Sequence, residues 1–328
     1  MSNEKLPDIK CPKCGKTIKE KAKEKKSAYS FESCVRRCEN CGCGASNAKS
    51  NPTYIYKNYI NNLPDKKDKD ILDILFNHTL NEKNREDKKI KFGFSTSEDA
   101  CSWIFFTYFL KKNKLDVLKD ILGLKSKIKD ILFWGVSYND LINSKISEIS
   151  DGVLENNNII KSLKQSEDAI GEVPRLRTEP DIIIVTDEEL VFVEVKVNSG
   201  MPTFNFNKEK NKENFEKYSK IKYYNNFDII GKKYKESINP FYELVRNWTL
   251  LNDLGEKLSK KVCLINLVKK EENEKIKVFK KAINESDKRI FKVRTWEEIF
   301  KDLEKKHNIN ISDDYFKNLR DNDCYQIN

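Results

Sequence analysis

The chain carries two strongly apolar runs, Asp181-Ile-Ile-Ile-Val-Thr186 and Leu190-Val-Phe-Val-Glu-Val-Lys-Val197, joined by the polar segment Asp187-Glu188-Glu189. β-Branched and aromatic residues dominate both runs, and a short polar connection between two such runs is typical of a β-hairpin. Polar residues interrupt the runs so rarely that both faces of the strands are expected to be covered. The hairpin therefore predicts the centre of an α/β domain.

The sequence around this hairpin predicts the remaining elements of that domain. Apolar periodicity indicates helices at 99–111, 241–257 and 296–306, and the first of them follows the capping-box spacing of Ser95 and Glu98. Short β-forming runs indicate strands at 131–136, 262–268 and 290–293, and residues 137–175 are expected to be loop and helix.

Ionisable residues interrupt the apolar hairpin near one end. If the chain turns between Asp187 and Glu188, antiparallel pairing sets Asp181 opposite Glu194, and Lys196 lies on the same side of its strand as Glu194. Charges inside a sheet cost several kcal/mol unless they are paired or bind a metal. A structural salt bridge is one explanation for them, and a catalytic site is the other.

Two carboxylates and a lysine in this arrangement suit the hydrolysis of phosphodiester bonds. The carboxylates can hold Mg²⁺, a hard cation that keeps bound waters, and one of these waters can become the nucleophile. Lys196 can orient that water or offset the charge that develops on the phosphate.

The segment Pro180-Asp181, twelve intervening residues and Glu194-Val195-Lys196 resembles the PD-(D/E)xK nuclease superfamily. The resemblance covers about two thirds of the chain and implies a restriction-endonuclease-like core, a central mixed sheet flanked by helices. It also implies that Asp181, Glu194 and the carbonyl of Val195 bind Mg²⁺ or Mn²⁺, and that Lys196 is the catalytic cation.

Members of this superfamily place further residues on two helices. A glutamate on the first helix often lies near the metal, and Glu98 matches it, although Glu98 also fits the capping box of Ser95. On the second helix, Tyr242-Glu-Leu-Val-Arg-Asn-Trp248 has Glu243 where a glutamine is common. Arg246 is expected to pair with an acid on the helix surface, and contact with a phosphate is the alternative.

Cysteines near the start of the chain predict a second metal site. Cys11-Pro-Lys-Cys14-Gly and Cys38-Glu-Asn-Cys41-Gly form two knuckles, and four thiolates in this arrangement favour a structural, tetrahedral Zn²⁺ site. The segment resembles a zinc ribbon. Cys34 and Cys43 remain alternative ligands.

The composition bounds the class of protein. The chain has 328 residues, of which 38% are hydrophobic and 35% charged, and its mean hydropathy is -0.71. We expect a zinc ribbon at 1–50, a helical connector at 51–93 and a nuclease-like domain at 94–328 with an insertion at about 198–237. The connector is expected to hold helices near 54–60 and 71–80. No apolar run is long enough for a membrane span or a signal peptide, so we expect a cytoplasmic protein without a membrane partner.

The net charge of +10 is concentrated in two segments. Residues 1–50 carry a net +6 and residues 201–240 a net +4, which favours a nucleic acid, DNA rather than RNA, as partner. The lysine- and tyrosine-rich insertion is expected to follow the strand or cover the site. The sequence thus predicts a magnesium-dependent nuclease. A nucleic-acid-binding protein without activity and a protein-interaction module are the alternatives, and a homodimer or a protein partner at the ribbon stays open.

Overall fold

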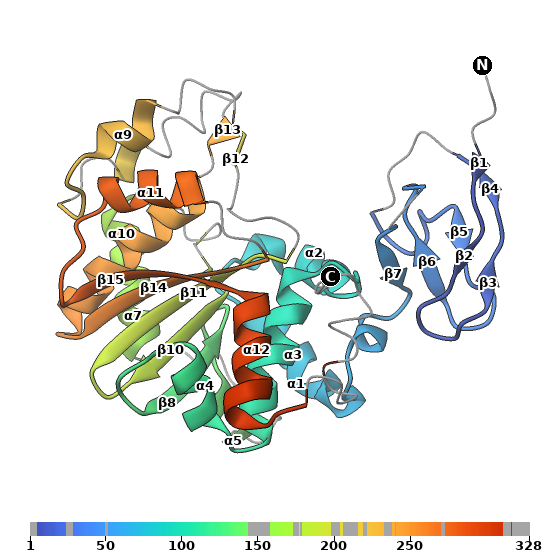
Figure 1. Ribbon diagram of the computed structural model, residues 1–328, viewed down its shortest axis with the longest axis horizontal. Helices are drawn as coiled ribbons and strands as arrows, with labels where there is room; N and C mark the ends of the chain where they lie inside the picture. Colours follow the sequence, from blue (N-terminus) through green and yellow to red (C-terminus); the bar gives the residue numbers. More distant parts are fainter. Residues whose placement is uncertain are drawn as a thin grey trace.

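The computed structural model combines a large α/β domain with a small cysteine-containing module (Figure 1). The structure describes residues 5–23, 29–49, 52–143, 158–172, 177, 179–197, 204–205, 216–218, 222–232, 238–239, 241–269, 273–310 and 316. In this part of the chain no helix has the length and apolar character needed to cross a membrane.

A mixed sheet forms the centre of the large domain. In the described residues it has six strands in the order β15-β14-β11-β10-β8-β9. The strands are β8 (Ile128–Phe133), β9 (Val136–Ser137), β10 (Ile182–Thr186), β11 (Glu189–Val195), β14 (Lys261–Val268) and β15 (Arg289–Thr295). Strands β11, β14 and β15 are parallel, whereas the other pairs are antiparallel. The expectation of a mixed sheet flanked by helices is confirmed.

Helices cover both faces of this sheet (Figure 1). One face packs on α1 (Lys69–His78), α2 (Arg85–Phe92), α3 (Glu98–Lys111), α4 (Leu115–Ile121), α5 (Tyr138–Asn143) and α12 (Trp296–His307). The opposite face packs on α7 (Asn158–Ala169), α9 (Phe227–Lys232), α10 (Tyr242–Lys257) and α11 (Asn273–Ala282). The helices expected at 99–111, 241–257 and 296–306 correspond to α3, α10 and α12.

Alternation along the central hairpin assigns its side chains to two cores. Ile182, Ile184 and Val193 belong to the core beneath α3 and α12, whereas Ile183 and Phe192 belong to the core beneath α7 and α10. All of these side chains are buried. Burial on both faces is the reason that the hairpin sequence is almost continuously apolar.

The strand expected at 131–136 is divided by a tight turn. Trp134 and Gly135 adopt φ values of +49° and +88° and join β8 to β9, as in the two-residue turns that match strand twist. A Cβ atom on residue 135 would lie 2.4 Å from the Leu80 side chain, so glycine is required there. Apolar composition cannot reveal this turn.

The cysteine module is built from short strands. They are β1 (Lys5–Leu6), β2 (Ile9–Lys10), β3 (Thr17–Ile18), β4 (Lys21–Ala22), β5 (Arg36–Arg37), β6 (Cys43–Ala45) and β7 (Tyr54–Tyr56). The prediction of a helix near 54–60 is wrong, because β7 pairs with β6 and is followed by the 3-10 helix η1 (Tyr59–Asn62). Two further 3-10 helices, η2 (Lys66–Asp68) and η3 (Glu82–Asn84), precede α1 and α2. The helix near 71–80 is α1.

Strand β7 joins the module to the large domain. Ile55 forms a bridge with Phe94, the Tyr56 N–H donates to the Gly93 carbonyl at 2.9 Å, and the Ser95 N–H donates to the Tyr54 carbonyl at 2.8 Å. These contacts place the segment that leads into α3 against the cysteine module.

Much of the expected insertion at 198–237 lies outside the described residues. Its described parts include strand β12 (Phe204–Asn205), which pairs with β13 (Ile238–Asn239), and helix α9. Of the tyrosines in the described part of the insertion, Tyr218 and Tyr223 are fully buried in the core beneath α10 and do not present their rings to a nucleic-acid strand.

Candidate functional site

The ionisable residues of the hairpin meet at the end of the sheet where β10 begins and β11 ends. Ile182 pairs with Val193, the register that places Asp181 opposite Glu194 as predicted. The Val195 N–H donates to Asp181 Oδ2 at 2.8 Å, so the aspartate is held against the end of β11. The register follows from the short Asp187-Glu188 turn.

Lys196 lies at the centre of this site. Its Nζ is 2.8 Å from Glu194 Oε1, 3.1 Å from Glu243 Oε2 and 3.2 Å from Glu98 Oε2. The Lys196 side chain is only 10% exposed and that of Glu194 only 4%. The Lys196 carbonyl also accepts a hydrogen bond from Trp296 Nε1 at 3.0 Å. One ammonium group is therefore shared by carboxylates from a strand and two helices.

Glu98 is the first residue of helix α3, and this position places its side chain at the site. The N-cap is Ser97, whose Oγ accepts from the Ala100 N–H at 3.1 Å, whereas Ser95 Oγ accepts from the Tyr54 N–H. The prediction of a capping box formed by Ser95 and Glu98 is therefore wrong, because Ser97 caps the helix. Instead, Glu98 Oε1 accepts from the Val197 N–H at 3.4 Å. Its carboxylate faces the end of β11 and not its own helix.

Helix α10 contributes a pair of residues one turn apart. Glu243 contacts Lys196, and the fully buried Asn247 donates from Nδ2 to Glu194 Oε2 at 2.8 Å. Sequence reasoning missed Asn247, although its i, i+4 spacing from Glu243 places both on one helix face. Among the described residues Arg246 has no acidic partner on the helix surface, contrary to expectation. Its guanidinium lies over the Tyr242 ring at 5.6 Å, and its Nε is buried without a hydrogen-bond partner in the same part of the chain.

Burial and mutual repulsion shift the proton affinities of these groups. Burial raises the pKa of Asp181 to about 7, and burial together with Asp181 raises that of Glu194 to about 8. Burial also raises the pKa of Glu98 despite the nearby Lys196. Although burial disfavours the charged form of Lys196, the carboxylates around it raise its pKa well above the usual value. For Glu243, burial would raise the pKa, but Lys196, Arg246 and hydrogen bonds together outweigh it and lower the pKa. Four carboxyl groups thus share the charges of Lys196 and Arg246.

A second buried lysine, absent from the sequence prediction, supports the same region. Lys88 Nζ of α2 is 3.1 Å from Asp99 Oδ1 and 3.2 Å from Glu179 Oε2, and it lies 4.6 Å from the centre of the Trp134 ring. Asp99 is the second residue of α3 and Glu179 precedes Pro180-Asp181. Lys88 therefore ties α2 to both segments that carry acidic residues of the site. It lies in a charged stretch next to Lys89 and Lys91, so its sequence context does not distinguish it.

A cavity of about 380 Å³ opens beside these acids. Glu98, Asp99 and Asp181 line it together with Lys91, Phe94, Thr96 and Ser97. Its oxygen atoms suit a hard divalent cation. However, among the described residues only the four knuckle cysteines form a compact metal-binding group, that is, three or more histidine, cysteine, aspartate or glutamate side chains whose ligand atoms all lie within 4.8 Å of one another. The carboxylates are more widely spaced around Lys196.

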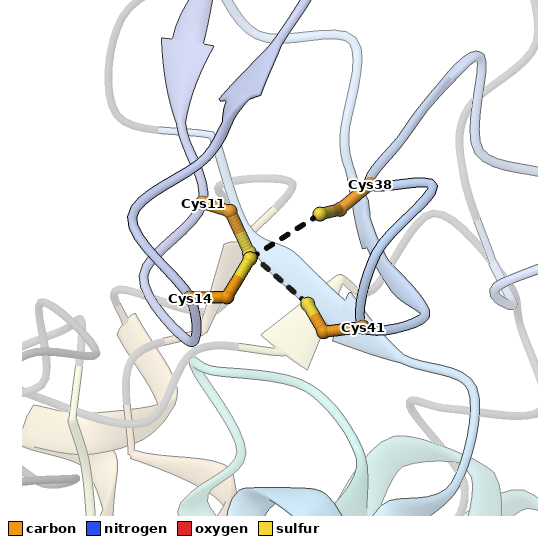
Figure 2. Close-up of side chains that lie close together, drawn as sticks. All are labelled: Cys11, Cys14, Cys38 and Cys41. Atoms are coloured by element: carbon orange, nitrogen blue, oxygen red, sulfur yellow. Dashed lines mark hydrogen bonds between the residues drawn. The ribbon is translucent and has the colours of Figure 1, made fainter.

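The predicted cysteine ligands converge in the N-terminal module. Figure 2 shows Cys11 and Cys14 on one loop facing Cys38 and Cys41 on another. The Cys11 and Cys41 Sγ atoms are 3.4 Å apart, and those of Cys14 and Cys38 are 3.5 Å apart. A tetrahedron with Zn–S bonds of about 2.3 Å requires sulfurs about 3.8 Å apart, so the four thiols lie close enough to hold a metal such as zinc.

The backbone of the two knuckles and the positions of Cys34 and Cys43 agree with Cys11, Cys14, Cys38 and Cys41 as the four ligands. Gly15 and Gly42 adopt φ values of +70° and +64°, a backbone conformation that residues other than glycine rarely adopt. Cys34 Sγ contacts the Ser30 carbonyl, and Cys43 Sγ contacts the Gly44 carbonyl. Both are buried outside the four-sulfur group.

Comparisons with known proteins add no identification: no family model, no curated protein and no solved structure matches this chain. The geometry of the two sites is therefore the basis for any function assigned to it.

Proposed function

We propose that the chain is a metal-dependent nuclease that hydrolyses phosphodiester bonds of nucleic acid, DNA rather than RNA. In this proposal the large domain is a restriction-endonuclease-like core of PD-(D/E)xK type, and the cysteine module is a zinc ribbon. The observation that carries the proposal is the buried Lys196, which contacts Glu98, Glu194 and Glu243 at the end of the sheet where Asp181 also lies.

The charge balance favours a cation site over a structural salt bridge. A buried ion pair contributes to stability only when its charges are matched and its hydrogen bonds are complete. Here Lys196 contacts three carboxylates and Asp181 lies at the same end of the sheet, with Arg246 as the second cation that acts on the group. The pKa values of Asp181 and Glu194 are raised. A divalent cation would relieve this excess of negative charge.

The oxygen donors of the site are of the type that such a cation prefers. Asp181, Glu194 and the carbonyl of Val195 are the proposed ligands, and Glu98 of α3 lines the cavity together with Asp181. When bound there, Mg²⁺ or Mn²⁺ would supply Lewis acidity and a bound water of lowered pKa. Lys196 would donate hydrogen bonds to the phosphate oxygens and offset their charge in the transition state. Asn247 would hold Glu194 in place through its 2.8 Å hydrogen bond.

The cysteine module supports a role in holding the nucleic acid. A groove of about 560 Å³ on the module is lined by four cations, Lys16, Lys19, Lys21 and Arg37, and by two acids, Glu20 and Glu39. The excess of cations favours phosphate binding. Arg36 does not belong to this surface, because it is fully buried and donates to the carbonyls of Pro7, Ser46 and Ala48.

Cleavage assays test the proposal. Single-stranded, double-stranded and branched DNA and RNA are incubated with the protein in Mg²⁺ and in EDTA. We expect Mg²⁺-dependent cleavage that is lost in Lys196→Ala while circular dichroism shows a folded protein. The matched control is Lys261→Ala, which removes a half-exposed lysine at the distant end of the sheet. Absence of cleavage in the wild type, or undiminished cleavage by Lys196→Ala, contradicts the proposal.

A further inference from the structure

The lining of the cavity beside the carboxylates contains two chemically different groups of residues. The acidic group is Glu98, Asp99 and Asp181, and the second group is Lys91, Phe94, Thr96 and Ser97. Its volume of about 380 Å³ lies within the range of about 300–1,000 Å³ found for small-molecule sites. The acidic group is anionic, and the second group offers an aromatic ring, hydroxyl groups and a lysine.

Phe94 is unusual among the aromatic residues near α3. Its neighbour Phe92 is fully buried and packs edge-to-face against Tyr59, Phe76 and Trp134. Phe94 is half-buried, belongs to neither core of the large domain and contacts no other ring in the described residues. Its side chain therefore contributes less to the core than that of any neighbouring aromatic residue, although it lines the cavity.

The backbone holds Phe94 firmly in this position. Its carbonyl accepts from Asn62 Nδ2 at 2.8 Å, and the residue forms a bridge with Ile55 of β7. Its neighbour Ser95 is bonded to Tyr54 through both its N–H and its side chain. A ring on such a fixed segment loses little conformational entropy when a ligand stacks on it.

Lys91 supplies the positive charge of the second group of lining residues. It is exposed, and its ammonium forms no ion pair with another described residue, unlike Lys88 and Lys89 on the same helix. The lysine is thus available for a ligand anion. An aromatic face next to a free ammonium is the combination that binds a nucleobase and its phosphate.

From these observations we propose that Phe94 and Lys91 bind the nucleotide next to the phosphate that is cleaved. The base stacks on Phe94, its phosphate contacts Lys91, and the scissile phosphate faces Glu98 and Asp181. This inference rests on the proposed function for the role of the acidic group. It adds a substrate-binding position on the segment that joins the cysteine module to α3.

Binding to a single-stranded thymidine hexanucleotide in Ca²⁺, which replaces Mg²⁺ without supporting cleavage, tests the inference. Phe94→Leu keeps an apolar side chain but removes the ring, and we expect it to weaken affinity about tenfold, whereas Phe94→Trp retains affinity. Lys91→Ala is expected to reduce the slope of log affinity against log salt by about 1. The exposed Lys112→Ala, at the opposite end of α3, serves as the control.

A covalent probe locates the contact independently of cleavage. Irradiation of the hexanucleotide containing 5-iodouracil is expected to crosslink the tryptic peptide that carries Phe94. Wild-type affinity in Phe94→Leu, crosslinks confined to other peptides, or no binding in Ca²⁺ each overturn the inference. Crosslinking at Phe94 without any cleavage in Mg²⁺ refutes the nuclease activity but supports this binding position. If Phe94→Leu leaves both cleavage and affinity unchanged, the binding position is refuted but the nuclease activity is supported.

Discussion

Asn247 shows how a single buried amide can determine the properties of a carboxylate. It is the side chain of α10 that donates to Glu194, while its own Oδ1 is buried without a partner in the described part of the chain. Loss of the donor would leave one oxygen of a buried carboxylate without its hydrogen bond, which costs about 1–3 kcal/mol.

We therefore expect Asn247→Leu to lower the free energy of unfolding by about 1–3 kcal/mol and to weaken Mg²⁺ activation of cleavage. Asn252→Leu is the matched control, because Asn252 is equally buried on α10 but donates to the Trp248 carbonyl. Denaturant unfolding and Mg²⁺ titrations of cleavage measure the two effects. Equal Mg²⁺ dependence in both variants would show that Asn247 has only a structural role.

The raised pKa values of Asp181 and Glu194 also predict a pH dependence. Both values lie above those of unfolded aspartate and glutamate, about 3.9 and 4.3, so the folded state binds more protons than the unfolded state. Their contribution to stability is complete below pH of about 4 and is lost as pH rises through about 7 and 8.

In zinc-loaded protein without Mg²⁺, we expect the free energy of unfolding to fall between pH 5 and pH 8, and added Mg²⁺ to restore part of it at pH 8. Glu194→Gln should show a shallower decline, since it removes one of the titrating groups. Glu188→Gln, at an exposed position on the same hairpin, should follow the wild type. Denaturation curves across this pH range measure the slopes, and a wild-type stability that rises with pH would contradict the prediction.

At the scale of elements, α2 has an importance that its composition conceals. Lys88 links it to the start of α3 and to the loop before β10 through ion pairs with Asp99 and Glu179. The adjacent Lys89 points to Asp73 and is four times as exposed, 40% against 10%. The two neighbouring lysines therefore form a natural matched pair.

Lys88→Met is expected to cost about 3–5 kcal/mol of stability because it leaves two carboxylates unpaired, whereas Lys89→Met should cost less than about 1 kcal/mol. Cleavage by Lys88→Met should fall about tenfold or more, because loss of the Lys88–Glu179 ion pair loosens the loop that positions Asp181. Thermal unfolding and steady-state kinetics under conditions where both proteins are folded measure these effects. Similar values for the two variants would show that the Lys88 ion pairs do not position the site.

At the scale of the whole molecule, the cysteine module and the carboxylate site share a structural connection. Strand β7 pairs with β6 of the module and bonds to residues 93–95 immediately before α3. Metal binding by the four cysteines would order this module, because small metal sites contribute their binding energy directly to folding.

Cys14→Ser is expected to abolish zinc binding and to increase hydrogen exchange in β2 to β7 and in the Gly93–Ser97 segment, while β10 and β11 stay protected. Cys34→Ala, which alters a buried cysteine outside the four-sulfur group, should retain one zinc per chain. Metal analysis and hydrogen exchange measured by mass spectrometry test this. A wild-type chain that binds no zinc, or unchanged exchange at 93–97, would refute the connection.

The amino-acid sequence determined the features that depend on local pattern. The two knuckles identify Cys11, Cys14, Cys38 and Cys41, and two apolar runs around a short turn predict the hairpin and the register of Asp181 and Glu194. Such features follow from sequence because neighbouring residues alone specify turn geometry and strand alternation.

Only the tertiary structure decided which side chains from distant helices support the site. Asn247 donates to Glu194 and Lys88 pairs with Asp99 and Glu179. For Glu98 the sequence left a site residue and a helix cap as alternatives, and the structure places it against Lys196. Phe94 likewise lines the cavity because β7 holds its backbone. Contacts between segments distant in sequence depend on how whole cores pack, and local propensity contains no information about them.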